Sequence, residues 1–207
     1  MKRPPLVLAS ASPRRRALLT ALSLRFEAVV PDVDEGVRDG ESADGHVGRL
    51  AEAKARAAAA LLPAGREAIV LAADTTVTLD GAILGKPESA EEALAMLRRL
   101  SGRVHEVWTG CHVLRTGDPR TGSAVVRSLV RFRPWDEALA RWYVGTGEPM
   151  DKAGAYALQG KGVLLTDGIE GSWSNVVGLP LEALPTLLAA VGDDLHARLM
   201  EGGGPGC

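Results

Sequence analysis

Near its start the 207-residue chain reads Leu6-Val7-Leu8-Ala9-Ser10-Ala11-Ser12-Pro13-Arg14-Arg15-Arg16. The apolar run predicts a short strand. Ser12 is a favourable helix N-cap and Pro13 suits the first helical position, so a tight turn and the start of a helix are expected next.

The three arginines of this segment would lie in the first turn of that helix. A cation there is unfavourable by about 0.3–1 kcal/mol, because it faces the positive end of the helix dipole. A bound anion would offset this cost. Helix-start amides, serine hydroxyls and arginines together predict a phosphate-binding cradle. The alternative is a solvated basic turn without a ligand.

The composition is that of an ordinary globular protein, with 46% hydrophobic and 24% charged residues. A formal net charge of -2 and 4% aromatic residues argue against a general nucleic-acid binder. The two cysteines, Cys111 and Cys207, give no disulfide framework. No apolar stretch resembles a complete signal peptide or approaches the ~20 residues of a membrane span. We therefore expect a cytoplasmic protein without nucleic-acid or membrane partners.

Strand-like and helix-like segments alternate along the chain, which predicts an α/β fold. Strands are expected at residues 26–30, 68–73, 104–114 and 124–132. Helices are expected at 13–22, 47–62, 89–100 and 136–144, and a final helix should end at about residue 191. We expect one domain over residues 1–200, formed by two lobes, and a flexible glycine-rich tail at 201–207.

Asp80 and Gly81 are a strong signal for a two-residue hairpin turn. In that register the numbers of opposed residues add up to 161, so Thr75 would face Lys86. The hairpin would bring Lys86 back beside Asp74 at the end of the preceding strand, where Pro87 predicts that the ladder frays. On the helix expected at 47–62, Lys54 lies on or beside the buried face.

Phosphoryl chemistry on a nucleotide needs cations for the phosphates, carboxylates for a divalent metal, and a base that positions water. The candidates are Arg14, Arg15, Lys54 and Lys86 for the first, and Glu35, Asp74 and Asp34 for the others. Each residue alone also has a simple structural explanation, as a surface lysine, a turn former or a solvated acid. P-loop and Rossmann motifs are absent, and the four histidines are scattered without zinc-site spacing. We expect His105 and His112 to be structural, and Trp135, Trp142 and Tyr143 to be core residues.

Taken together, these motifs resemble the Maf family of nucleoside triphosphate pyrophosphatases. The resemblance covers roughly residues 6–185. It rests on residues 8–15, 33–35 (Val-Asp-Glu), 50–55, 73–77, 85–87 (Gly-Lys-Pro), 101–105 with 109–110, 147–149, 151–156 and 175–180.

The resemblance implies hydrolysis of a nucleoside triphosphate to the monophosphate and pyrophosphate, with Mg²⁺, or alternatively Mn²⁺ or Co²⁺. It also implies an inosine triphosphate pyrophosphatase-like fold with a central mixed sheet, flanking helices and two lobes around a cleft. A homodimer is expected on the same ground.

By the same resemblance, individual positions acquire roles. Asp74 takes the position of the proton acceptor, with Lys86 and Glu35 as further catalytic residues and with Glu35 and Asp74 as metal ligands. The residues expected to bind substrate are Ser10, Arg14, Arg15, Lys54, Thr75 and Gln159, of which Arg14, Thr75 and Gln159 are linked to substrate choice.

Gln159 decides between the branches of the family. A side-chain amide offers both a donor and an acceptor, and so matches the mixed edge of a uracil or thymine ring. The branch that prefers 7-methylguanosine triphosphate has an acidic residue in this stretch. The sequence therefore resembles the dTTP/UTP branch. Two alternatives stay open: a purine-directed pyrophosphatase of the inosine triphosphate type, and a non-catalytic nucleotide-binding regulator of cell division.

Overall fold

The computed structural model describes residues 3–202, which divide into two compact units. Within the described residues, unit 1 comprises 3–74, 110–125 and 178–202, and unit 2 comprises 75–109 and 126–177. Residues 201 and 202 of the predicted tail end the helix α7 (Leu195–Gly202). The rest of that tail, 203–207, lies outside the described residues.

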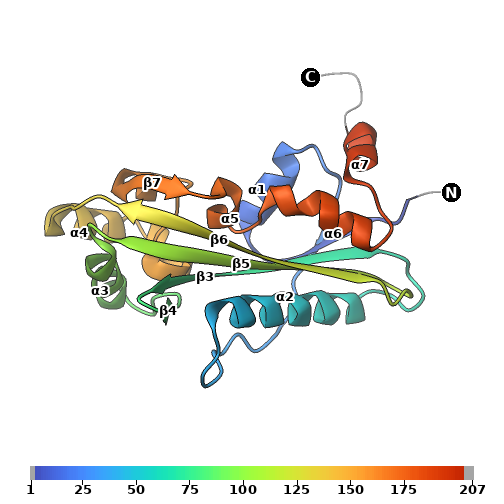
Figure 1. The fold of residues 1–207 in the computed structure, drawn as a ribbon, viewed down its shortest axis with the longest axis horizontal. Helices are drawn as coiled ribbons and strands as arrows, with labels where there is room; N and C mark the ends of the chain where they lie inside the picture. Colours follow the sequence, from blue (N-terminus) through green and yellow to red (C-terminus); the bar gives the residue numbers. More distant parts are fainter. Residues whose placement is uncertain (1–2, 203–207) are drawn as a thin grey trace. The chain divides into compact units, whose positions relative to one another are not determined.

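Unit 1 is built on three parallel strands. The central strand β1 (Leu6–Ala9) pairs with β2 (Glu27–Val29) on one side and with the first part of β3 (Ile69–Leu79) on the other. The helix α1 (Pro13–Ala21) connects β1 to β2, and α2 (Ala43–Ala60) connects β2 to β3. The two helices cover opposite faces of these strands (Figure 1).

Small residues form the contact between the helix α2 and the strands. Ala55 and Ala58 are fully buried in a cluster with residues of β1 and β3. A Cβ atom built on Gly110 would stand 2.3 Å from the carbonyl oxygen of Val47, so only glycine is tolerated there. The buried face of α2 also includes Lys54, as the sequence predicts.

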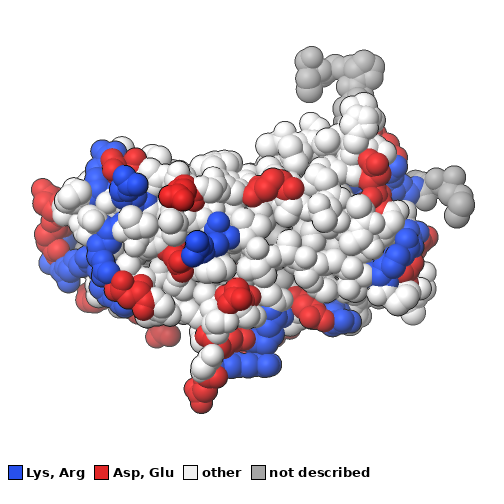
Figure 2. Space-filling view, viewed as in Figure 1, with Lys and Arg blue, Asp and Glu red and all other residues white. Residues whose placement is uncertain are grey.

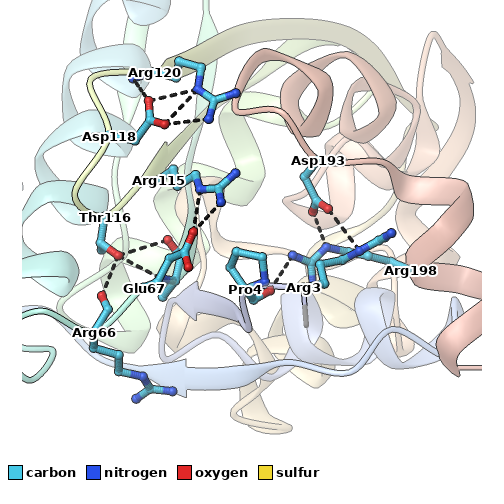
Figure 3. A network of polar contacts seen from close by, with 11 residues as sticks. Arg3, Pro4, Arg66, Glu67, Arg115, Thr116, Asp118, Arg120, Asp193 and Arg198 are labelled. Atoms are coloured by element: carbon cyan, nitrogen blue, oxygen red, sulfur yellow. Dashed lines mark hydrogen bonds and ion pairs between the residues drawn. The ribbon is translucent and has the colours of Figure 1, made fainter. Parts of the chain in front are cut away.

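A network of polar contacts in unit 1 lies at the amino-terminal ends of β1 and β3 (Figure 3). Thr116 accepts from the Ala68 amide at 2.8 Å and donates to the Arg66 carbonyl at 2.7 Å, while Arg115 pairs with Glu67. Asp193 pairs with Arg198, which also donates to the Pro4 carbonyl at 2.8 Å. These bonds attach α7, a helix that was not predicted from the sequence, to the start of the chain.

In unit 2, the second part of β3 forms the expected hairpin with β4 (Ala82–Leu84). Val77 opposes Leu84 and Leu79 opposes Ala82, so the partner numbers add up to 161 as predicted. The ladder ends at Val77 and Leu84, and the pair predicted for Thr75 and Lys86 lies beyond it. The strand β3 is longer than predicted, because it runs through Asp74 instead of ending there.

The remaining elements include the predicted ones in their expected order, together with a strand at 166–170 and a helix at 173–177 that were not predicted from the sequence. The strands are β5 (Val104–Arg115), β6 (Thr121–Phe132) and β7 (Thr166–Glu170), and the longer helices are α3 (Ala90–Leu100), α4 (Glu137–Gly145), α5 (Trp173–Val177) and α6 (Leu184–Ala190). The strand order is β2-β1-β3-β5-β6-β7, with β4 on β3. Parallel and antiparallel pairs both occur, which confirms a mixed α/β fold.

The neighbouring aromatic residues Trp142 and Tyr143 of the helix α4 differ in their exposure. Trp142 is 47% exposed, so its assignment to the core is wrong, whereas Tyr143 is fully buried as predicted.

On the face drawn in Figure 2, acidic and basic side chains lie interspersed. Among the described residues, no helix is both long enough and apolar enough to cross a membrane.

His105 belongs to an aromatic cluster in the core of unit 2. Its Nε2 lies 2.7 Å from the Tyr156 hydroxyl, and its ring makes an edge contact with Phe132. Within the described part of the chain, its Nδ1 is buried without a hydrogen-bond partner. Burial lowers the pKa of His105 to about 4, so the folded protein holds this side chain neutral. The expectation that this histidine is structural fits these contacts.

Because the folded-state pKa of His105 is below its unfolded value near 6.5, the unfolded chain binds the proton more readily between these pH values. We expect the free energy of unfolding to fall by about 3 kcal/mol from this group as the pH drops from 6.5 to 4. Denaturation of the wild type and of His105→Gln across this range measures the effect. The exposed His196→Gln is the control; equal pH slopes in all three proteins would contradict the prediction.

Candidate active site

The predicted turn after β1 is present in unit 1. Ser12 caps α1 by accepting from the Arg15 amide, and Pro13 is the first helical residue. The Ser10 hydroxyl accepts from the Ser12 amide at 3.1 Å. The first turn of α1 contains no acidic residue to balance its arginines. The local geometry is therefore that of an anion cradle.

Arg15 is the arginine that the fold holds in place. Its Nε donates to the Gly178 carbonyl at 2.7 Å, and its side chain also donates to the Ser10 hydroxyl at 3.2 Å. Burial lowers the pKa of Arg15, and the negative charges of Asp74 and Glu35 partly offset this shift. This coupling indicates that the cradle and the two carboxylates belong to one electrostatic site. Arg14, the adjacent predicted residue, is half-buried.

Three predicted residues of unit 1 meet in one cluster. The Lys54 ammonium lies 2.6 Å from Oδ1 of Asp74 and 2.5 Å from Oε1 of Glu35. Lys54 and Asp74 are both about nine-tenths buried, whereas the Glu35 side chain is 45% exposed. One ammonium thus joins a carboxylate from a strand to a carboxylate from a loop.

The topology of unit 1 explains why these groups converge. The chain leaves β1 for β2 on one side and then crosses to β3 on the other, so the connections reverse direction next to β1 and β3. Ligands of α/β sheets bind at such switch points, beyond the carboxyl ends of the strands. Ala9 pairs with Ala72, which places Ser10 and Asp74 just beyond the paired residues of the two strands.

The other three predicted residues, Thr75, Lys86 and Gln159, belong to unit 2. The Thr75 hydroxyl lies 2.9 Å from the Thr109 hydroxyl. Lys86 is exposed and follows β4, and the adjacent Gly85 carbonyl accepts from the Gly154 amide at 3.0 Å. Gln159 is half-buried.

A carboxylate that the sequence analysis left without a role organises the loop around Gln159. Glu148 accepts from the Tyr143 hydroxyl at 2.9 Å and from the amides of Lys161 and Gly162 at 3.0 Å. Desolvation opposes ionisation of Glu148, yet these backbone and hydroxyl donors lower its pKa overall. Gly147-Glu148-Pro149 was among the motifs of the family resemblance, but its local sequence gives no sign of contacts thirteen or more residues away.

The expected divalent metal has two suitable oxygen ligands here. In the described part of the chain, no group of three or more His, Cys, Asp or Glu residues is arranged to hold a metal ion. Mg²⁺, however, is commonly bound by one or two carboxylates together with substrate phosphates. Glu35 and Asp74 meet on one ammonium beside a cradle suited to phosphate, so this pair fits a metal that the substrate helps to bind.

Comparison with known proteins shows which family this chain belongs to. Residues 5–191 match the protein family described as Maf-like protein. The chain belongs to the Maf family. Among its relatives, the dTTP/UTP pyrophosphatase of Myxococcus xanthus is 53% identical over 193 residues, which cover 93% of this chain and 95% of the relative.

Two further Maf relatives bear the same name. The dTTP/UTP pyrophosphatase of Nitratidesulfovibrio vulgaris is 50% identical and covers 94% of this chain and 91% of its own length. That of Moorella thermoacetica is 48% identical, with 94% of this chain and 98% of its own length covered. The family resemblance stated from the motifs is confirmed.

Because Lys54 and Asp74 are buried against each other, we expect their contributions to stability to be strongly coupled. In a double-mutant cycle of Lys54→Met and Asp74→Asn, the interaction energy should be about 1–3 kcal/mol, measured by urea denaturation. The matched control on the same helix is the exposed pair Glu52 and Arg56, for which Glu52→Gln and Arg56→Met should couple by at most about 0.5 kcal/mol. Additive effects at the buried pair would contradict the assigned contact.

Proposed function

We propose that this protein hydrolyses dTTP and UTP to the corresponding monophosphate and pyrophosphate, as a housekeeping enzyme of the nucleotide pool. The observation that carries the proposal is the cluster of Lys54, Asp74 and Glu35 at the switch point of unit 1, electrostatically coupled to Arg15 of the phosphate cradle. The names of the relatives, all about half identical over nearly the whole chain, support the substrate class.

In the proposed reaction, the triphosphate lies against the start of α1. Arg14, Arg15, Lys54 and Lys86 share its negative charge, and the Ser10 hydroxyl helps to position it. An ammonium has three N–H donors, and Glu35 and Asp74 engage two of those of Lys54. The third donor is then suited to a phosphate oxygen.

Asp74 orients a water molecule and takes its proton as the water oxygen attacks the α-phosphorus. The new bond joins the water oxygen to the α-phosphorus, and the bond from this phosphorus to the bridging oxygen of the β-phosphate breaks. Pyrophosphate leaves with the bonding electrons. A divalent metal held by Glu35 and Asp74 supplies neutralisation of charge on the phosphate oxygens when bound.

Gln159 and Thr75 are assigned to choice of the base. The amide of Gln159 presents one donor and one acceptor group, which match the adjacent N–H and C=O groups of uracil and thymine. As part of the same proposal, the fold is the inosine triphosphate pyrophosphatase-like fold with two lobes around a cleft, and the protein acts in the cytoplasm as a homodimer with Mg²⁺.

A panel of nucleoside triphosphates with detection of pyrophosphate tests this proposal. We expect release from dTTP and UTP in the presence of Mg²⁺, with inosine triphosphate and 7-methylguanosine triphosphate at least about tenfold poorer by kcat/KM. A preference for inosine triphosphate would identify a purine-directed enzyme instead. No release from any triphosphate, with Mg²⁺ or Mn²⁺ present, would favour a nucleotide-binding regulator of cell division.

Replacing the proposed base should separate catalysis from binding. We expect Asp74→Asn to lower kcat by about 10²- to 10⁴-fold, because the amide cannot accept the proton of the attacking water. Nucleotide affinity, measured by calorimetry, should change little. Asp80→Asn, in the exposed turn between β3 and β4, is the matched control and should keep wild-type turnover. Near-normal turnover of the Asp74 variant would refute its role as base.

A further inference from the structure

The loop that carries Gln159 in unit 2 is attached on both sides of this residue to one small group of polar atoms. Two residues before Gln159, the Ala157 amide donates to the Tyr143 hydroxyl at 3.1 Å. Two and three residues after it, successive backbone amides donate to the Glu148 carboxylate at 3.0 Å. The Tyr143 hydroxyl itself donates to this carboxylate at 2.9 Å. Hydrogen bonds from both sides of Gln159 therefore lead to Glu148.

Both oxygens of the Glu148 carboxylate take part in these bonds. Oε1 accepts from the Tyr143 hydroxyl and from the Gly162 amide, and Oε2 accepts from the Lys161 amide. An ionised carboxylate suits this arrangement because it is an acceptor at every lone pair. A glutamine of the same shape does not, because its NH₂ group would face one of the donors.

Glu148 is also held by its own backbone. Its carbonyl accepts from the Lys152 ammonium at 2.7 Å, and its amide donates to the Thr146 hydroxyl at 3.3 Å. The Thr146 hydroxyl donates its hydrogen to the Tyr143 carbonyl at 2.7 Å, near the end of α4. The carboxylate therefore extends from a fixed turn after this helix and presents a fixed acceptor to the loop.

Two glycines allow the backbone of the loop to approach this group of atoms. A Cβ atom at Gly160 would stand 2.6 Å from Oε2 of Glu148, and the φ of +126° at this position also disfavours other residues. A Cβ atom at Gly162 would stand 2.6 Å from the Tyr143 hydroxyl oxygen. The loop is therefore shaped to pack directly on the carboxylate, which confines the backbone next to Gln159.

We infer that Glu148 is a positioning residue for recognition of the base, because it holds the loop from which Gln159 reaches the uracil or thymine ring. This inference rests on the proposed function, in which Gln159 pairs with the base. It adds the reason why a glutamine in an irregular loop can make that contact effectively. An unattached loop would lose conformational entropy on binding, and this loss would offset much of the energy of the new hydrogen bonds. With Glu148 in place, the backbone is ordered when the protein folds.

The test compares two ligands that share a triphosphate group, of which only one carries a base. The first is α,β-imido-UTP, whose bridging nitrogen prevents cleavage at the α-phosphorus, and the second is inorganic triphosphate. Calorimetry with Mg²⁺ measures the dissociation constant of each. In Glu148→Gln we expect the affinity for α,β-imido-UTP to fall by about three- to tenfold, the effect of one hydrogen bond, and that for triphosphate to stay within about twofold.

Further variants show whether Glu148 acts through Gln159. Gln159→Ala should lower the affinity for α,β-imido-UTP alone, and adding Glu148→Gln to it should cause no further loss. Tyr143→Phe removes the hydroxyl at the other side of the loop and should lower the same affinity. The matched control is Glu137→Gln in α4, an exposed carboxylate paired with Arg98, which should leave both affinities unchanged.

Each result has a distinct meaning. Equal loss of affinity for both ligands in Glu148→Gln would show a role in the fold only and would overturn the inference. Unchanged affinity for α,β-imido-UTP in this variant, together with a clear loss in Gln159→Ala, would also overturn it and leave the proposed function intact. Unchanged affinity in Gln159→Ala would refute the assignment of Gln159 to the base, and the inference with it. Partial unfolding does not imitate any of these results, because calorimetry reports the fraction of competent protein separately as the stoichiometry.

Discussion

The site of unit 1 depends on the contact between Lys54 and Asp74. Removing either charge from water costs several kcal/mol unless the partner is present with good geometry. The contact in turn requires that α2 lies close to β3, which the fully buried Ala55 and Ala58 and the glycine at 110 permit. Small residues on α2 and in β5 are therefore a condition for placing a buried charge pair, and not only a packing preference.

The carboxylate of Asp74 also helps to explain how unit 1 tolerates arginines at the start of α1. Without a partner, a cation in the first turn of a helix is unfavourable. Arg15 is held by the Gly178 carbonyl and the Ser10 hydroxyl, and its charge is balanced through space by Asp74. The arginine is thus already fixed in the free protein, so little conformational entropy would be lost on binding of the proposed phosphate. Preorganised charge of this kind is what phosphoryl transfer requires.

Local signals in the sequence were sufficient for much of this arrangement. Ser12 and Pro13 began α1 as predicted, and the turn at residues 80–81 determined the register of β3 with β4, because their effects extend over only a few residues. The contact of Lys54 with Asp74 was not predictable in this way, since it depends on packing between separate elements. The exposure of Trp142 has the same origin: its helical spacing was compatible with a core position, but tertiary contacts bury Tyr143 instead.

Adjacent residues of β3 make contacts of different chemistry, and this difference fits their proposed tasks. Asp74 contacts an ammonium, and charge is suited to phosphates and to proton transfer. Thr75 contacts a neutral hydroxyl in a chain that ends at a backbone carbonyl. None of these neutral groups titrates near neutral pH. Under the proposed function, these contacts of Thr75 would therefore stay unchanged while the neighbouring carboxylate takes up and releases a proton.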